Sequence, residues 1–458
     1  MTDKKRFFSD VKNVFSLGFP LLFGRLSHYF HQVTDSAMMG HFGKGSNELA
    51  ALAMAGIFYW MMTTLVWPLN AGIQAMVTRK KGAAEKGISN DEEIGIVFDN
   101  GLLTTLIVIT FAVALSFLAR PFLTLLIRDK DVLELAVDYI DIVRFSLIPF
   151  GLMNMLARFF ASVKIARHLM AVSILTNLLN FAFNYILIFG RLGFPAMGIK
   201  GAALGTLLSC LCGLIYILII YFRKNHMSRY KYFRFKDIRK NIITNILKIA
   251  APPGIQNFMV FLFILFYESM VEKISVTALA ATTVAFSAFR INKTLVGGFS
   301  HAAAIHTGNA IGANDGQSAK RAVAAGQFIA LIVGIAVFTA AFFFPDILAV
   351  IFSKNTETLA EIARAFRFFS IFYFIEITAF TIELVFVNNG YGRYVLFSEF
   401  STNFIFIIAF TWITSLISAN VYLAWLGFGL YQLFHALILH IGFRKGRWLK
   451  TLLDKPLD

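Results

Sequence analysis

The sequence predicts an all-α membrane protein with about twelve transmembrane helices arranged as two six-helix lobes. Three observations lead to this fold class: the composition, the order of apolar runs and an internal repeat. With 58% hydrophobic residues, 15% charged residues and a mean hydropathy of +0.69, the chain carries more apolar surface than a soluble core could bury. Because lipid offers the backbone no hydrogen-bond partners, helices are the expected spanning form.

Apolar runs of spanning length alternate with short polar segments along the chain. We expect spans at residues 15–40, 49–78, 94–119, 138–157, 170–190, 199–222, 246–271, 278–307, 322–352, 366–388, 396–418 and 421–442. Most of the 42 basic residues fall on the side of the two termini. The positive-inside rule therefore predicts a multi-pass protein of the inner or plasma membrane with both termini cytoplasmic. These short basic segments form no basic face, so the net charge of +16 does not indicate nucleic-acid binding.

The two halves of the chain resemble each other at an offset of 230 residues. Leu49-Ala50-Ala51 matches Leu279-Ala280-Ala281, and Gly82-Ala83 matches Gly312-Ala313. Six spans separate the matches, so both halves have the same orientation and can rock about a central cavity. We therefore expect an N-lobe at 1–222, a basic cytoplasmic linker at 223–245 and a C-lobe at 246–458.

A polar stripe runs along the first span, at helical spacings of three, four and seven. Its members are Arg25, His28, His31, Gln32 and Asp35. An ionisable group inside a span costs about 2.5–3.5 kcal/mol, so Asp35 is a functional candidate that can load and release a proton, with His28 or His31 sharing it. Alternatively, Asp35 pairs with Arg25 or a histidine and fixes helix packing. We expect no metal site, because only Asp35 could complete the histidine pair.

Amides line one face of the fifth span. Asn177, Asn180 and Asn184 recur there at helical spacing. Their carbonyl oxygens can coordinate sodium or bind Asp35, or the amides can serve as hydrogen-bonding contacts between helices. The sequence leaves both possibilities open.

Charged residues also occur in the second half of the chain. Arg290 and Lys293 lie within one turn of the eighth span, and Glu376 and Glu383 lie on one face of the tenth. Fixed positive charges near the cavity would repel a cationic substrate and attract an anionic one. If they instead pair with Glu268, Glu376 or Glu383, they form an interior salt-bridge network.

Several ordered motifs resemble the multidrug and toxic compound extrusion (MATE) family along essentially the whole chain. They are Pro20, Asp35, Met39-Gly40-His41-Phe42-Gly43, Leu49-Ala50-Ala51, Asn180, Asn184, Leu187-Ile188-Phe189-Gly190, Gly193, Pro195, Gly198, Gly201-Ala202-Ala203, Thr206, Gly308, Gly312-Ala313, Gly316 and Arg444-Lys445-Gly446-Arg447-Trp448. Each motif alone is weak, and their order makes them specific. The resemblance implies a V-shaped antiporter, here a monomer, whose central cavity binds small organic, often amphiphilic or drug-like molecules in exchange for protons or sodium ions.

The same resemblance suggests where coupling takes place. It links Asp35 to cation coupling, but Asn184 stands where relatives often carry a second aspartate. Glu376 and Glu383 do not fall on the positions near Val260 or Phe261 and near Thr378, where sodium-coupled relatives keep their acidic residues, although together on one face they could substitute for that site. We therefore expect proton coupling through the N-lobe and no cofactor other than the coupling ion. The alternative is a flippase of lipid-linked or anionic precursors. No nucleophile elbow or HExxH motif is present, so we expect no enzyme.

Overall fold

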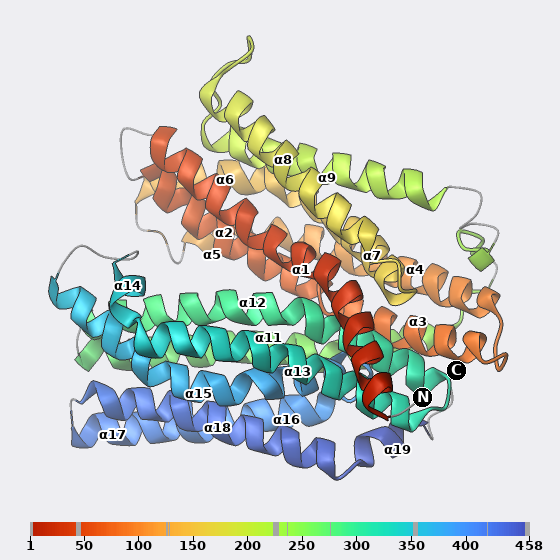
Figure 1. Ribbon diagram of the computed structural model, residues 1–458. Helices are drawn as coiled ribbons and strands as arrows, with labels where there is room; N and C mark the ends of the chain where they lie inside the picture. Colours follow the sequence, from red (N-terminus) through yellow and green to blue (C-terminus); the bar gives the residue numbers. More distant parts are fainter. Residues whose placement is uncertain are drawn as a thin grey trace. The chain divides into compact units, whose positions relative to one another are not determined.

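The computed structural model describes residues 3–42, 47–124, 127, 129–222, 229–235, 237–274, 276–350, 356–418 and 420–453. Within these residues the chain is almost entirely helical and contains no strand (Figure 1). The predicted all-α fold class is therefore confirmed.

The helices of the first half are α1 (Asp3–Phe42), α2 (Asn47–Val66), α3 (Leu69–Glu85), α4 (Asp91–Ser116), α5 (Ala119–Thr124), α6 (Lys130–Val143), α7 (Leu147–Ser162), α8 (Arg167–Phe189) and α9 (Ile199–Tyr221). Those of the second half are α11 (Lys240–Ile274), α12 (Val276–Gly312), α13 (Gly316–Phe343), α14 (Pro345–Ala349), α15 (Thr356–Asn388), α16 (Gly392–Thr402), α17 (Thr411–Ile417), α18 (Val421–Arg444) and α19 (Arg447–Leu453). A 3₁₀ turn joins α6 to α7, and a π-helical stretch at Asn403–Phe410 joins α16 to α17.

In the part of the chain that the structure describes, nine helical segments are long and apolar enough to cross a membrane. Together with α1, α2–α3 and α12, they cover all the spans expected from the sequence. The second span is not continuous, because α2 ends at Val66 and α3 begins after Pro68. Proline lacks the N–H that would continue the hydrogen-bond ladder, which explains the break.

Local sequence signals set several helix ends. The Asn90 side chain accepts a hydrogen bond from the Glu93 N–H at 3.1 Å and caps α4. Asp315 caps α13 in the same way, accepting from the Ser318 N–H at 2.9 Å. Helix α8 ends at Phe189 and is followed by Gly190, whose φ of +66° lies in the left-handed region that glycine adopts without strain.

Contacts divide the chain into two compact units. Unit 1 comprises Met1–Leu22 and Ala251–Leu457, and unit 2 comprises Phe23–Ala250 together with Asp458. The sequence-based lobes instead kept all of α1 with the N-terminal half. Each unit has its own apolar core, with Phe58 and Tyr139 buried in unit 2 and Trp425 buried in unit 1.

The segment between the halves is fixed to unit 2 by the carboxylate of Asp99 on α4. This carboxylate accepts backbone hydrogen bonds from Phe233 at 2.6 Å, from Arg234 at 2.9 Å and from Phe235 at 2.9 Å. Phe233 and Phe235 have φ of +61° and +49°, a backbone form in which consecutive N–H groups converge on one anion. The linker residues that the structure describes are therefore docked on α4.

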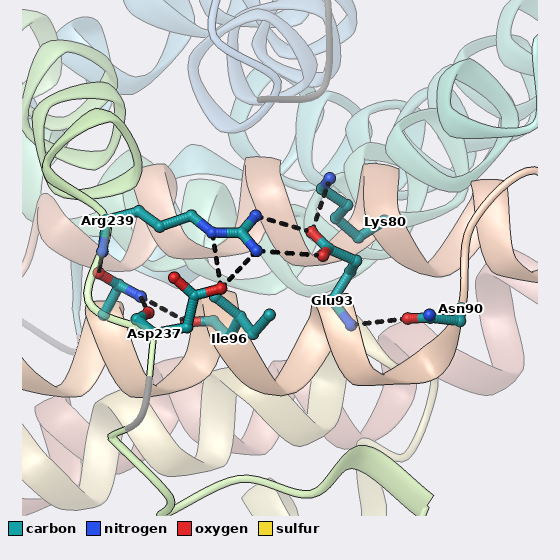
Figure 2. Close-up of polar contacts among 7 residues, drawn as sticks. Lys80, Asn90, Glu93, Ile96, Asp237 and Arg239 are labelled. Atoms are coloured by element: carbon teal, nitrogen blue, oxygen red, sulfur yellow. Dashed lines mark hydrogen bonds and ion pairs between the residues drawn. The ribbon is translucent and has the colours of Figure 1, made fainter.

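A second set of contacts holds the end of the linker, as Figure 2 shows. Asn100 donates to the Asp237 carbonyl at 2.9 Å and accepts from the Arg239 N–H at 2.8 Å. The Arg239 guanidinium lies 3.3 Å from Glu93, which also accepts from Lys80 at 3.2 Å. The hydrogen bond from Arg239 lowers the pKa of Asp237. Helix α11 then begins at Lys240, inside the linker expected over 223–245.

Aromatic packing completes the docking. Tyr230 and Tyr232 are buried, and the Tyr232 hydroxyl donates to the Tyr221 carbonyl at 2.9 Å. Burial raises the pKa of Tyr232. Gly95 permits the close approach of the linker, since a Cβ at this position would lie 1.9 Å from the Tyr230 carbonyl oxygen.

Asp99→Ala is expected to loosen the linker, because three backbone N–H groups lose their acceptor. Leaving such donors unsatisfied costs about 1–3 kcal/mol. Faster trypsin cleavage after Arg234 or Arg239, together with a lower melting temperature in detergent, would report the change. The control is Glu92→Ala, which removes only a surface ion pair with Lys231 and should change neither measurement. An unchanged cleavage rate in Asp99→Ala would contradict the docking role.

Candidate functional site

Five ionisable side chains converge inside unit 1. Lys293 comes from α12, Glu376 and Glu383 from α15, Glu399 from α16 and His435 from α18. Glu376 and His435 are each only 1% exposed. Charges buried this deeply in a membrane protein are costly unless they are paired, so the cluster is the first candidate for function.

The first pair joins α12 to α15. The Lys293 Nζ lies 2.5 Å from Oε1 of Glu376, and it also lies over the Phe380 ring, 5.3 Å from the ring centre. The other carboxylate oxygen of Glu376, Oε2, is buried and accepts no hydrogen bond from any residue that the structure describes. One carboxylate oxygen of Glu376 thus pairs with the ammonium, and the second oxygen can accept a further hydrogen bond or a proton.

The second pair joins α16 to α18. Oε2 of Glu399 lies 3.0 Å from His435 Nε2, and its Oε1 accepts a hydrogen bond from the Tyr431 hydroxyl at 2.7 Å. The opposite ring nitrogen of His435, Nδ1, lies 3.0 Å from the Ser398 hydroxyl. Contacts on both ring nitrogens fix the orientation of the imidazole.

Glu383 lies between the two pairs. Gln256 on α11 donates to its Oε1 at 3.0 Å, and its Oε2 lies 3.9 Å from His435 Nε2. Glu383 and Glu399 also interact electrostatically with Lys293. With all three carboxylates ionised, and with Lys293 and His435 both charged, the cluster carries one net negative charge. It can therefore accept one more monovalent cation or a proton.

The register of α12 against α15 positions this cluster. The two helices pack side by side and run in the same direction. Their polar contacts follow one another in order along both helices: Tyr373 Oη to Phe289 O at 2.6 Å, Lys293 to Glu376 at 2.5 Å, Ser300 to Thr381 at 2.9 Å, and Asn389 Nδ2 to Ala304 O at 3.1 Å. Hydrogen bonds on both sides of the ion pair hold it in place.

Three residues singled out from the sequence are therefore brought together, namely Lys293, Glu376 and Glu383. Arg290 lies outside this group: it is exposed and interacts electrostatically with Glu268. Of the two readings left open for the basic eighth span, the structure shows interior pairing for Lys293.

Sequence reasoning missed Glu399 and His435. Glu399 is the one acidic residue of the expected span 396–418, and His435 shares its span with His440; both were usable signals because ionisable residues are costly in lipid.

The asparagines of α8 lie against α9. Asn180 donates to the Thr206 hydroxyl at 3.4 Å, and Asn184 donates to the Asn180 side-chain carbonyl at 3.4 Å. Asn177 donates to the Ser173 carbonyl of its own helix at 2.8 Å. Asn180 and Asn184 are buried, and the contact from Asn180 to Thr206 is of the kind expected between packed helices.

Glycines on α9 make this close packing possible. A Cβ at Gly205 would lie 2.1 Å from Asn184 Oδ1, and one at Gly201 would lie 2.7 Å from the Leu187 carbonyl. The two glycines are four residues apart and lie on one face of the helix, as in other close helix pairs in membranes.

The stripe in the first span lies on α1, but its side chains are outside the described part of the structure. This applies to Arg25, His28, His31, Gln32 and Asp35. Their proposed roles in coupling and in the cavity remain predictions.

Comparison with known families gives a match over most of the chain. The MatE family model matches residues 20–186 and 252–413. A probable multidrug resistance protein NorM from Agrobacterium fabrum is 25% identical over 316 residues, covering 69% of this chain and 66% of that relative. A probable multidrug resistance protein NorM from Bacillus cereus is 24% identical over 384 residues, with 82% of each chain covered.

Solved structures share the fold at low sequence identity. A MATE crystal structure in the bent conformation matches with a TM-score of 0.86 and 19% identity, covering 99% of this chain and 98% of that chain. A MOP superfamily transporter from Pyrococcus furiosus, whose reversed pocket polarity suggests a different function, matches with a TM-score of 0.83 and 19% identity, covering 98% of this chain and 97% of that chain. These similarities concern the arrangement of helices.

Proposed function

We propose that this chain, which belongs to the MATE family of multidrug efflux transporters, is a secondary active antiporter. It exports small organic, often amphiphilic or drug-like molecules in exchange for protons, or for sodium ions, by alternating access between two lobes. The relatives named as multidrug resistance proteins support this substrate class. The protein is embedded in the lipid bilayer as a multi-pass transporter.

The observation that carries the coupling proposal is the buried cluster around Glu376, Glu383 and Glu399. Ionisable groups inside membrane spans are candidates for ion pathways and proton relays, because burying them in a membrane protein costs free energy. An ion that neutralises such a group changes the free energy difference between the two states of the lobe, and it can drive their exchange only through that differential binding. Asp35 provides the second coupling candidate, on α1.

The remaining proposals concern the surroundings of the transporter. Most basic residues lie in the segments on the side of the termini, which supports placing both termini in the cytoplasm and the protein in the inner or plasma membrane. We propose a monomer that needs no cofactor beyond its coupling ion.

The test is transport by purified protein in liposomes with proton and sodium gradients imposed separately. A fluorescent organic cation should be moved by a proton gradient, and Asp35→Asn should reduce the rate to that of protein-free liposomes, because an amide cannot carry the proton. Asp10→Asn is the matched control, since Asp10 lies on the same helix and pairs with Arg321 at 3.1 Å outside the stripe. Parental transport in Asp35→Asn would reject the coupling role of Asp35.

A second candidate function is a flippase of lipid-linked or anionic precursors. The exposed guanidinium of Arg290 favours it, because arginine binds phosphate oxygens in a bidentate geometry. Arg290→Glu should then abolish transfer of a fluorescent anionic lipid while leaving organic cation transport intact. If cation transport alone is observed and the charge reversal has no effect, the flippase is excluded.

A further inference from the structure

The Lys293 ammonium occupies the position in which a free monovalent cation would neutralise Glu376. It lies 2.5 Å from Oε1 of this carboxylate, which is 1% exposed. We infer that Lys293 is a built-in cation of the unit 1 cluster, so that Glu376 exchanges protons and does not bind sodium ions. The inference rests on the proposed antiport function, because it names the ion that this site would couple.

Ammonium and sodium ions carry the same charge and both bind carboxylate oxygens. A sodium ion on the second oxygen of the same carboxylate would be strongly repelled by the ammonium on the first, because the site has a low dielectric constant. A tethered ammonium has a very high local concentration and does not leave the site by diffusion. Sodium must therefore displace a cation that the chain itself supplies.

Among the residues that the structure describes, three carboxylates, one hydroxyl and the His435 imidazole surround Lys293. Glu376 and Glu383 face it from α15, Glu399 from α16, and the Tyr431 hydroxyl and His435 ring come from α18. On the neighbouring α11, Glu268 interacts with Arg290 rather than forming part of this group. The one net negative charge of the cluster is then available to a proton.

Proton exchange fits the two different environments of the pair. The side chain of Glu376 is 2% exposed, whereas that of Lys293 is 32% exposed and sits on a flexible four-carbon stem. When a proton from water binds Glu376, the carboxylate becomes a neutral acid and its attraction for the ammonium is lost. Lys293 is then free to turn toward Glu383 or Glu399, and loss of the proton restores the pair. The proton would bind on Oε2 of Glu376, which accepts no hydrogen bond within the described part of the chain.

The experiment measures binding of radioactive sodium to purified protein in detergent. All variants carry Asp35→Asn, which removes the other candidate coupling carboxylate. With Lys293 present, we expect no sodium binding that depends on Glu376. Lys293→Ala should bind sodium at least about tenfold more tightly than the protein that retains Lys293, because the variant leaves a buried carboxylate without its cation. Adding Glu376→Gln to Lys293→Ala should remove this binding.

Two controls distinguish loss of the Lys293 charge from a general disturbance of the structure. Lys293→Arg keeps the cation and should not bind sodium, and Arg290→Ala removes an exposed cation one turn away and should not create a site. The inference fails if Lys293→Ala gains no sodium binding. It also fails if the protein with Lys293 intact binds sodium and Glu376→Gln abolishes that binding, a measurement that needs no Lys293 variant to fold. Sodium binding is measured in detergent and does not require transport. The results can therefore be interpreted even if the protein shows no antiport in liposomes.

Discussion

Gly201→Ala is expected to separate α9 from α8 and to lower the free energy of unfolding by about 3 kcal/mol. The added methyl group would lie 2.7 Å from the carbonyl carbon and oxygen of Leu187, which belong to the backbone and cannot rotate away. The helices must therefore move apart, which also strains the hydrogen bond between Asn180 and Thr206. Thermal unfolding in detergent would measure the loss.

Gly56→Ala is the matched control, since Gly56 also lies inside a helix. No atom that the structure describes lies within 4 Å of a Cβ at Gly56. The change should be neutral or stabilise the helix by about 0.5–1 kcal/mol, because alanine loses less backbone entropy than glycine on folding. Equal melting temperatures for Gly201→Ala and the parental protein would show that the helices are not packed through this glycine.

The membrane helices could be predicted from the sequence because each span is encoded locally. A run of apolar residues long enough to cross lipid forms a helix whatever its partners are. Helix ends were less predictable. The break before α3 follows from Pro68, a residue visible in the sequence, whereas the early start of α11 at Lys240 depends on contacts with Asn100 and Glu93, which are distant in sequence.

The docked linker could not be predicted, because its basic composition is typical of a solvated loop. Its position depends on Asp99, an acidic residue more than 130 positions earlier in the chain. Phe233 and Phe235 adopt a positive φ, which brings their N–H groups together. Phenylalanine rarely adopts this backbone conformation, so the sequence gives no sign of it.

The candidate site was predictable only in part. The cost of burying charge identified Lys293, Glu376 and Glu383, but the sequence could not decide whether the lysine faces substrate or a glutamate. That choice depends on the register between α12 and α15, which long-range packing sets. The stripe around Asp35 was equally visible in the sequence, and its role in coupling stays a prediction.

Glu399→Ala is expected to have the largest effect on stability of the changes considered. Glu399 is 6% exposed and makes contacts with both His435 and Tyr431. Its removal leaves the tyrosine hydroxyl buried without its acceptor and leaves His435 Nε2 with only the longer contact to Glu383, at 3.9 Å. Breaking a buried pair by deleting one partner costs about 3–5 kcal/mol. We expect a large drop in the melting temperature in detergent.

The size of the effect should depend on charge and on hydrogen bonding; one further variant separates these two contributions, and another serves as the control. Glu399→Gln keeps an acceptor for Tyr431 but removes the negative charge beside His435, so it should lie between the parental protein and Glu399→Ala. Glu361→Ala removes only an ion pair with the exposed Arg364 and should cost at most about 1 kcal/mol. If Glu399→Ala is no more destabilising than Glu361→Ala, the Glu399–His435 contact is not a stabilising part of the cluster. If adding His435→Leu to Glu399→Ala restores the melting temperature, the cost lies in the imidazole that has lost its contact with Glu399, because the second change removes that group.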